Sequence, residues 1–437
     1  MLLRTFGHAC LTIEEKIGKP LLVTDPWLVG SCYFNSWFLE NYPSQVEMEY
    51  LLETEFVYFT HEHPDHFHPE TISLFSQKTK MIVPNYPTKT MKTSLEEYGF
   101  QVIEIEKLRW KKLSEFVSIL FIPVIGEDSI LLIKTGTVLA INQNDAPLSR
   151  ANIKRINTLK NDLNIQTTVL LRSYSNASSL NSFFIENERV KVLDKNDFIE
   201  RVKNTCADML VDYYIPFASQ AVFLHQSSKW ANAYRVSAED FEKTWDINTK
   251  LLPPYVSLNL ANFCFEFTKN INYSGLSREK LRDIETDFLK ESAFVLRESD
   301  LREIHRRLST YRMFFLIGFI RRISFKTSFG EGFSYSCTKD QVSRGMVENS
   351  DIVFKVSGQV IKNAFINDHL EDIGLCQLCE IHLNNSLFAK VHFFQLFFFF
   401  HVLSRLKSYG YFSSFDKFMR VARYFMLASK KINNKTA

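Results

Sequence analysis

The chain has 437 residues and a formal net charge of +3 at pH 7. This length allows two domains with a large core, and the charge gives no electrostatic reason to expect nucleic-acid binding. The seven cysteines show no regular spacing and the N-terminus carries no long apolar stretch, which argues against a disulfide scaffold and a signal peptide, so we expect a cytoplasmic protein.

Short strands separated by turns are predicted over the first part of the chain. Residues 9–13 and 20–24 predict paired strands, and the second ends at Asp25-Pro26 because proline cannot extend a β-ladder. Residues 56–59 predict a further strand, followed by a helix at residues 69–77. The pattern continues with strands at 81–84, 101–103, 118–123, 129–134, 137–142 and 167–172 and with helices at 88–98 and 148–165.

The residue pattern of the sequence changes after Pro253-Pro254. Charged helical patterns occupy residues 277–310, and mixed structure follows to the end. We therefore predict a first domain at residues 1–270 and a C-terminal domain at residues 271–437. The longest apolar run, residues 393–400, is well short of the roughly 20 residues that a membrane span needs, so we expect a buried helix or strand there and no membrane span.

A dense group of histidines follows the strand at residues 56–59. The segment Thr60-His61-Glu62-His63-Pro64-Asp65-His66 places three imidazoles and two carboxylates in one loop. His61 and His63 alternate by two, so both can face one metal, while Asp65 and His66 on the following turn can reach a second. Imidazole and carboxylate are ligands for zinc, iron and manganese, so this loop predicts a metal site.

Two further candidate ligands also follow apolar strands. Asp145 comes directly after the strand at residues 137–142, and His225 comes after the apolar segment at residues 213–218. Strand ends on one edge of a sheet can converge on the histidine loop, and a carboxylate between two cations reduces their mutual repulsion. The alternatives, a turn residue at Asp145 and a surface histidine at His225, stay open.

The histidine loop, with Asp25 before it and Asp145 after it, resembles the signature of the metallo-β-lactamase superfamily. A closer resemblance is to the metallo-β-lactamase-type part of CMP-N-acetylneuraminate hydroxylase. The matching segments are Asp25-Pro26-Trp27-Leu28-Val29-Gly30 with Trp37 after it, Val57 through His66, Asn144-Asp145, and Tyr214-Ile215-Pro216-Phe217-Ala218 with His225 after it; residues 356–400 echo the C-terminal segment more faintly.

This resemblance implies a fold and a set of ligands. The fold is an αββα sandwich at residues 1–270, with a mixed α+β extension at residues 271–437 that resembles the hydroxylase C-terminal region. The implied metal ligands are His61, His63, Asp65, His66, Asp145 and His225, with Asp65 also as the catalytic residue. They would hold two divalent metals, zinc or iron.

The chain departs from the family pattern in two places. The hydroxylase carries a Rieske iron–sulfur domain, which needs close pairs of cysteine and histidine, and this sequence shows no such pairs. The superfamily also supplies a further histidine before the later Asp, whereas no histidine occurs between His68 and His225. Glu127 or Asp128 could substitute as a ligand, or could simply lie on a surface hairpin. We therefore expect the site of His61 and His63 to bind its metal more weakly.

Three residues near the implied site receive other roles. His8 lies in Gly7-His8-Ala9, which resembles the opening of lactonase-like members of the superfamily, so it could line the site or pack in a strand. Asp25 is also expected to line the site. His68 is expected to cap or line the start of the following helix.

Three functions follow from this site. The first is a metal-dependent hydrolase that uses activated water on a small polar substrate, including a sugar-nucleotide or phosphorylated one. The second is a di-iron oxygenase of the hydroxylase type, which would need a separate electron-transfer protein. The third is a non-catalytic member that binds a ligand or partner without turnover. Histidine and carboxylate ligands suit both zinc and iron, so they do not distinguish the first two.

Overall fold

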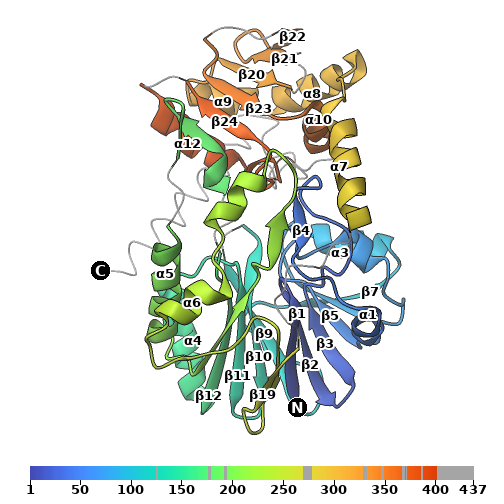
Figure 1. Ribbon diagram of the computed structural model, residues 1–437, viewed down its shortest axis with the longest axis vertical. Helices are drawn as coiled ribbons and strands as arrows, with labels where there is room; N and C mark the ends of the chain where they lie inside the picture. Colours follow the sequence, from blue (N-terminus) through green and yellow to red (C-terminus); the bar gives the residue numbers. More distant parts are fainter. Residues whose placement is uncertain are drawn as a thin grey trace. The chain divides into compact units, whose positions relative to one another are not determined.

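The computed structural model (Figure 1) forms two compact units. Unit 1 comprises Met1–Ala177 and Val192–Asp283, and unit 2 comprises Ser178–Lys191 and Ile284–Ala437. The predicted domain boundary between residues 270 and 271 lies outside the described residues. These are residues 1–124, 126–175, 179–190, 194–268, 278–327, 332–345, 349–366, 370, 372–384 and 387–400.

The first sheet of unit 1 brings the N-terminal strands together with strands from residues 256–267. Its order is β19-β18-β1-β2-β3-β5-β6-β7. β1 and β3 both pair with β2 in antiparallel fashion, and β3, β5, β6 and β7 are mutually parallel. The strands are β1 (Leu2–Gly7), β2 (Cys10–Lys16), β3 (Lys19–Thr24), β5 (Phe56–Tyr58), β6 (Lys80–Pro84), β7 (Gln101–Ile105), β18 (Val256–Asn259) and β19 (Phe265–Phe267).

The second sheet of unit 1 has the order β17-β15-β12-β11-β10-β9-β8. β9, β10 and β11 form an antiparallel meander, and β11, β12 and β15 are parallel. The strands are β8 (Lys111–Lys112), β9 (Val117–Val124), β10 (Asp128–Thr135), β11 (Val138–Asn144), β12 (Thr167–Ser173), β15 (Tyr213–Phe217) and β17 (Lys250–Leu251). A separate ribbon pairs β4 (Trp37–Leu39) with β16 (Ala221–Phe223).

Both faces of the second sheet are buried, as alternating side chains show. Leu131 and Ile133 of β10 belong to a core cluster shared with the first sheet. Ile130 and Leu132 point the other way, into a cluster with Ile156 of a covering helix. Because side chains alternate along a strand, the near-continuous apolar run of β10 packs into the core on both faces of the sheet.

Helices cover the outer faces of the two sheets (Figure 1), so unit 1 is an αββα sandwich of the metallo-β-lactamase type, as predicted. Four of these helices begin at a Ser or Asp cap, where Ser44, Ser149, Asp194 and Ser237 accept backbone hydrogen bonds from the first turn. The helices are α1 (Gln45–Leu52), α2 (Pro69–Ile72), α3 (Thr90–Glu97), α4 (Arg150–Asp162), α5 (Lys195–Asp208) and α6 (Ala238–Thr244). The predicted helix at residues 69–77 is shorter in the structure, and His68 caps it by accepting from Thr71 N.

Unit 2 has a mixed α+β fold around a sheet of order β14-β13-β24-β23-β20-β21-β22. Its strands are β13 (Phe183–Ile185), β14 (Glu188–Arg189), β20 (Arg322–Lys326), β21 (Gly332–Ser336), β22 (Gln341–Arg344), β23 (Ile352–Lys355) and β24 (Glu380–Leu383). Its helices are α7 (Arg278–Ser292, which begins in unit 1), α8 (Glu298–Thr310), α9 (Arg312–Ile317), α10 (Gly358–Ile366), α11 (Asp372–Leu375) and α12 (Ala389–Phe398).

The long apolar run near the C-terminus lies mostly on α12, so the helical alternative predicted for it is correct. Leu396 and His392 of this helix are buried, whereas Phe394 is exposed. Among the described helices, none is both long and apolar enough to cross a bilayer.

Candidate metal centre

The ends of several strands deliver the candidate ligands to one edge of the sandwich. β1, β3 and β5 run in the same direction, so His8 after β1, Asp25 after β3 and the histidine loop after β5 share that edge. Asp25 N donates to Tyr58 O at 2.9 Å, and this bond joins the ends of β3 and β5. Asp145 follows β11 of the facing sheet. Asp145 Oδ1 lies 4.0 Å from His61 Nε2, so the predicted approach of this strand end to the histidine loop occurs.

His8, Asp65 and His66 form the first of two ligand groups, here called the inner group. One ligand atom from each lies within 4.8 Å of the others, and all three residues are buried. His8 Nε2 donates to Asp65 Oδ2 at 2.8 Å, and His66 Nε2 lies 3.5 Å from the same oxygen. The Tyr33 hydroxyl donates to Asp65 Oδ1 at 2.6 Å. Asp65 is therefore held at both oxygens, and its Oδ2 faces the two imidazoles.

His61, His63 and Asp145 form the second group, here called the outer group. One ligand atom from each of them also lies within 4.8 Å of the others. His61 Nε2 and His63 Nδ1 share a hydrogen bond of 2.8 Å, and Asp145 Oδ1 lies 4.0 Å from His61 Nε2. His61 is buried, whereas the Asp145 side chain is 39% exposed. The outer group is thus the part of the cluster that solvent reaches.

The two groups are adjacent. His66 Nε2 of the inner group lies 3.5 Å from Asp145 Oδ1 of the outer group, and the rings of His61 and His66 have centroids 4.2 Å apart. Asp145 therefore lies within reach of both groups. A carboxylate in this position can reduce the repulsion between two cations.

The residues of the inner group fit a metal ion. Among the described residues, His66 Nε2 has no hydrogen-bond partner although it is buried. It faces carboxylate oxygens of Asp65 and Asp145, both at 3.5 Å, which is too long for a hydrogen bond. A buried nitrogen without a partner is rare and calls for an explanation such as an ion. Two imidazoles and one carboxylate are also a ligand set that zinc and iron accept.

Carboxylates on the far side of the imidazoles fix the orientation of two candidate ligands. Asp25, which is fully buried, accepts from Thr60 N and Thr60 Oγ1, both at 2.7 Å, and its Oδ2 lies 3.1 Å from His66 Nδ1. Asp128 Oδ1 lies 3.3 Å from His61 Nδ1. A carboxylate on one ring nitrogen leaves the other directed at the metal and makes it a better ligand.

Ligation by Glu127 or Asp128 in place of the missing histidine stays a prediction, and the structure shows other contacts of these two carboxylates. Asp128 contacts His61 at Nδ1, the nitrogen opposite the one that faces His63, so it orients a ligand of the outer group. The Glu127 carboxylate accepts from Thr88 N and from the Thr88 hydroxyl. Neither residue belongs to a ligand group of the described structure.

The acidic and basic side chains of the cluster shift one another's pKa. Burial alone would lower the pKa of His66, but the carboxylates of Asp65, Asp145 and Asp25 raise it to about 10. Burial alone would raise the pKa of Asp65, but His66 and His8 hold it well below its usual value. The inner group therefore favours a positive charge between its carboxylates, which a metal ion would supply.

The remaining predicted ligands are arranged differently from the expected grouping. Asp145 falls in the outer group rather than with Asp65, His66 and His225, and His8 joins the inner group rather than only lining the site. His225 follows β16, and its Nδ1 accepts from Ser227 N at 3.0 Å. It belongs to neither ligand group within the described part of the chain, so ligation by His225 stays a prediction.

Aromatic side chains close the cluster on one side. Trp27 and Trp37 contact the His8 ring edge to face, at centroid distances of 5.4 and 6.4 Å, and both are buried. Tyr33, Phe34 and Asn35 have φ angles of 52°, 59° and 57°. Three consecutive non-glycine residues in the left-handed region are strained. This strained turn places the Tyr33 hydroxyl on Asp65.

The difference in exposure predicts that two bound metals would leave at different chelator concentrations. The outer group should lose its metal first, because Asp145 is exposed and His63 is only half-buried, whereas the inner group is buried throughout. Titration with a chelator, followed by elemental analysis after desalting, should show two steps. Asp145→Asn should lower the chelator concentration at which the first metal is released more than the concentration at which the second is released. Two metals released in a single step, with equal affinity, would contradict this order.

The sequence is similar to several known proteins over part of its length. No protein-family model matches the chain. It is 35% identical over 101 residues to a Mycolicibacterium smegmatis protein named for a Rieske 2Fe-2S cluster, covering 23% of this chain and 19% of that protein. It is 31% identical over 120 residues to the cytidine monophosphate-N-acetylneuraminic acid hydroxylase of Asterias rubens, covering 26% and 17%. Against the Danio rerio hydroxylase it is 26% identical over 239 residues, covering 51% and 39%.

Solved structures give more distant likenesses. An isothiocyanate hydrolase from Delia radicum gut bacteria matches with a TM-score of 0.41 and 12% identity, covering 60% of this chain and 99% of that one. A metallo-β-lactamase-fold protein from Bacillus subtilis matches with a TM-score of 0.37 and 9% identity, covering 58% and 95%.

The matched regions span well under half the length of these curated relatives. Unit 1, by its layers and sheet order, has the metallo-β-lactamase fold. The chain has this fold in its first unit and partial homology to cytidine monophosphate-N-acetylneuraminic acid hydroxylases and to Rieske-type relatives.

Proposed function

We propose that unit 1 is a metal-dependent hydrolase that acts with activated water on a small polar substrate. The observation that carries this proposal is the pair of adjacent groups, each with two histidines and one carboxylate, bridged by Asp145 within 3.5 Å of His66. Catalytic zinc sites use such sets and keep a position open for water.

The cations would be held by His8, Asp65 and His66 in the inner group and by His61, His63 and Asp145 in the outer group. Bound there, a divalent metal supplies Lewis acidity and a water whose pKa is lowered to about 7. Asp65 would present a fixed carboxylate to the metal of the inner group, because Tyr33 and His8 hold both of its oxygens in place. Asp145 is the most exposed carboxylate of the cluster, so it would hold the outer metal on the side that solvent and substrate reach.

A second candidate function is oxygenation by a di-iron centre. The named hydroxylase and Rieske-type relatives support it, and two histidines with one carboxylate also form the ligand set of non-haem iron oxygenases. This function would require a separate electron-transfer protein. A third candidate, binding without turnover, has no observation that favours it over the other two. The cytoplasmic location and the likeness of residues 271–437 to the hydroxylase C-terminal region stay predictions.

Elemental analysis tests these alternatives directly. The protein is purified aerobically from cells grown with both iron and zinc, and its metals are counted per chain. The same preparation is assayed with ester, lactone and phosphodiester substrates, and for oxygen uptake with cytidine monophosphate-N-acetylneuraminic acid and a reduced electron donor. We expect close to two metals per chain and hydrolysis that does not need oxygen. Bound iron with substrate-dependent oxygen uptake would replace hydrolysis by oxygenation, and metal-free, inactive protein would favour binding alone.

A further inference from the structure

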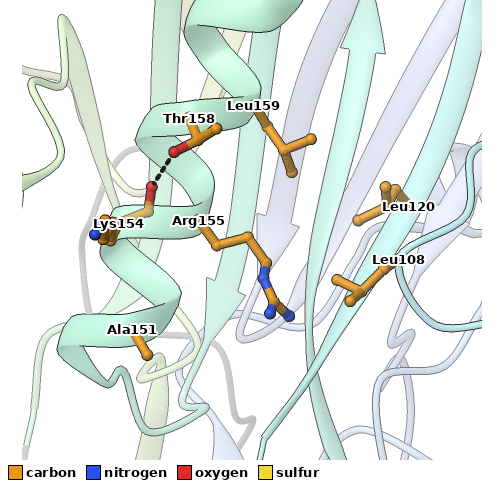
Figure 2. A pocket seen from close by; sticks show the side chains of 7 residues that line it. All are labelled: Leu108, Leu120, Ala151, Lys154, Arg155, Thr158 and Leu159. Carbon is orange, nitrogen blue, oxygen red and sulfur yellow. Dashed lines mark hydrogen bonds between the residues drawn. The ribbon is translucent and has the colours of Figure 1, made fainter. Parts of the chain in front are cut away.

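A cavity of about 440 Å³ lies on unit 1 between α4 and the strand β9, and Figure 2 shows its lining. None of its lining residues belongs to the inner or outer ligand group. The volume falls within the range of small-molecule pockets, roughly 300 to 1,000 Å³. The lining residues are Leu108, Leu120, Ala151, Lys154, Arg155, Thr158 and Leu159.

Leucine side chains form the apolar walls of the cavity. Leu159 comes from α4, Leu120 from β9, and Leu108 from the loop before β8 (Figure 2). Leu108 is 39% exposed and has a φ of 59°, which is unfavourable for a leucine. Its backbone N–H donates to Phe121 O at 3.0 Å, which holds this conformation. Strained backbone positions cluster at ligand-binding sites, so this conformation is consistent with a role of Leu108 in binding.

Arg155 gives the cavity one charged group. It lies one helical turn after Ala151 and one turn before Leu159, so all three share a face of α4. In Figure 2 its guanidinium extends from the helix towards Leu108, across the space between α4 and the loop. In the part of the chain that the structure describes, Arg155 has neither an ion pair nor a hydrogen bond to its guanidinium. A guanidinium without a partner can bind a carboxylate or phosphate through two hydrogen bonds.

The two sequence segments that contain Leu108 and Arg155 carry a surplus of positive charge. Residues 107–112 and 150–155 contain exposed cations and no acidic residue, although the whole chain has a net charge of only +3. Within the described residues none of these cations makes an ion pair. They are Lys107, Arg109, Lys111, Lys112, Arg150, Lys154 and Arg155. Such a concentration of one sign raises the local concentration of anions.

We propose that this cavity binds an amphipathic anion, a small molecule with an acyl or aryl body and a carboxylate or phosphate head. The leucine walls would take the apolar body, and Arg155 would bind the head group. The site lies outside the metal groups, so it would bind a ligand other than the substrate of those groups. The proposal does not depend on which reaction the metal centre performs.

Calorimetry with octyl phosphate tests the site, with octanol and inorganic phosphate as probes of each half of the ligand. The full chain should bind octyl phosphate at least about tenfold more tightly than either part. Arg155→Gln removes the charged group and should weaken binding about tenfold. Leu108→Gly removes one apolar wall and relieves the positive φ, so it should weaken binding by a similar factor without lowering the unfolding temperature.

Lys78→Gln is the matched control, because Lys78 is exposed, lies just before β6 of the first sheet, and is neither a lining residue nor one of the cations near the cavity. This change removes the same charge and should alter the affinity by less than about twofold. Elemental analysis must give the same metal content in all variants. Any phosphate that binds at the metal groups then contributes equally to the affinities that are compared. Sedimentation with phosphatidylglycerol vesicles separates a lipid head group from a soluble anion, since only the former gives co-sedimentation that Arg155→Gln abolishes. Equal affinity for inorganic and octyl phosphate, or unchanged binding in Arg155→Gln, would overturn the proposal.

Discussion

Asp65→Asn is expected to lower turnover by at least about a hundredfold, the scale on which groups that act on a proton or orient water contribute. The substitution keeps the shape of the side chain but removes its negative charge. In the wild-type protein that charge faces His8 and His66 through Oδ2, while Tyr33 holds Oδ1. The inner group would lose its single carboxylate, and with it most of its attraction for a cation. Steady-state rates with the substrate found by the hydrolysis assays measure the effect.

Glu62→Gln is the matched control for this prediction. Glu62 lies in the same loop, and its replacement removes the same charge, yet Glu62 belongs to neither ligand group of the described residues. Its turnover should stay within about threefold of wild type. Circular dichroism should show that both variants fold, because Asn can still accept the hydrogen bond from Tyr33. Full activity in Asp65→Asn would show that the proposed site takes no part in the reaction.

Much of the candidate site could be predicted from the sequence because its residues directly follow apolar segments that are easily recognised as strands. The histidine loop and Asp145 each follow an apolar strand, and parallel strands bring their ends to one edge. The partition of ligands between the two groups could not be predicted in this way. It depends on which nitrogen of each imidazole faces the cluster, and the buried partners Asp25 and Asp128 determine this for His66 and His61.

Tyr33 and the fold of unit 2 gave no sequence signal that could have been used. The turn at Tyr33 is left-handed, but Tyr33-Phe34-Asn35 contains no glycine to mark it. In unit 2, β13 pairs with β24 in parallel although Phe183 and Ile381 are far apart in the sequence. Pairing over such a separation leaves no local pattern, because only the final packing selects the partner strand.

Asp25→Ala is expected to destabilise unit 1 by about 3 kcal/mol and to weaken metal binding by roughly 10- to 100-fold. Asp25 is fully buried and accepts hydrogen bonds from Thr60 N and Thr60 Oγ1. Its removal leaves these donors and His66 Nδ1 without their carboxylate. Alanine also tolerates the φ of 40° at this position less well than aspartate does. Urea denaturation of chelated protein and metal titration of folded protein measure the two effects.

Asp25→Asn and Asp212→Ala separate the structural effect from the effect on the metal. Asparagine at position 25 can still accept from Thr60 N, so it should retain more stability, but its amide cannot replace the charge beside His66 and metal binding should still weaken. Asp212 accepts from Thr168 N at 2.7 Å just before β15, at the opposite end of this strand from the metal centre. Asp212→Ala should therefore lower stability by about 1 kcal/mol without changing metal affinity. If Asp25→Ala matched Asp212→Ala in both measurements, Asp25 would have no part in holding His66 towards a metal.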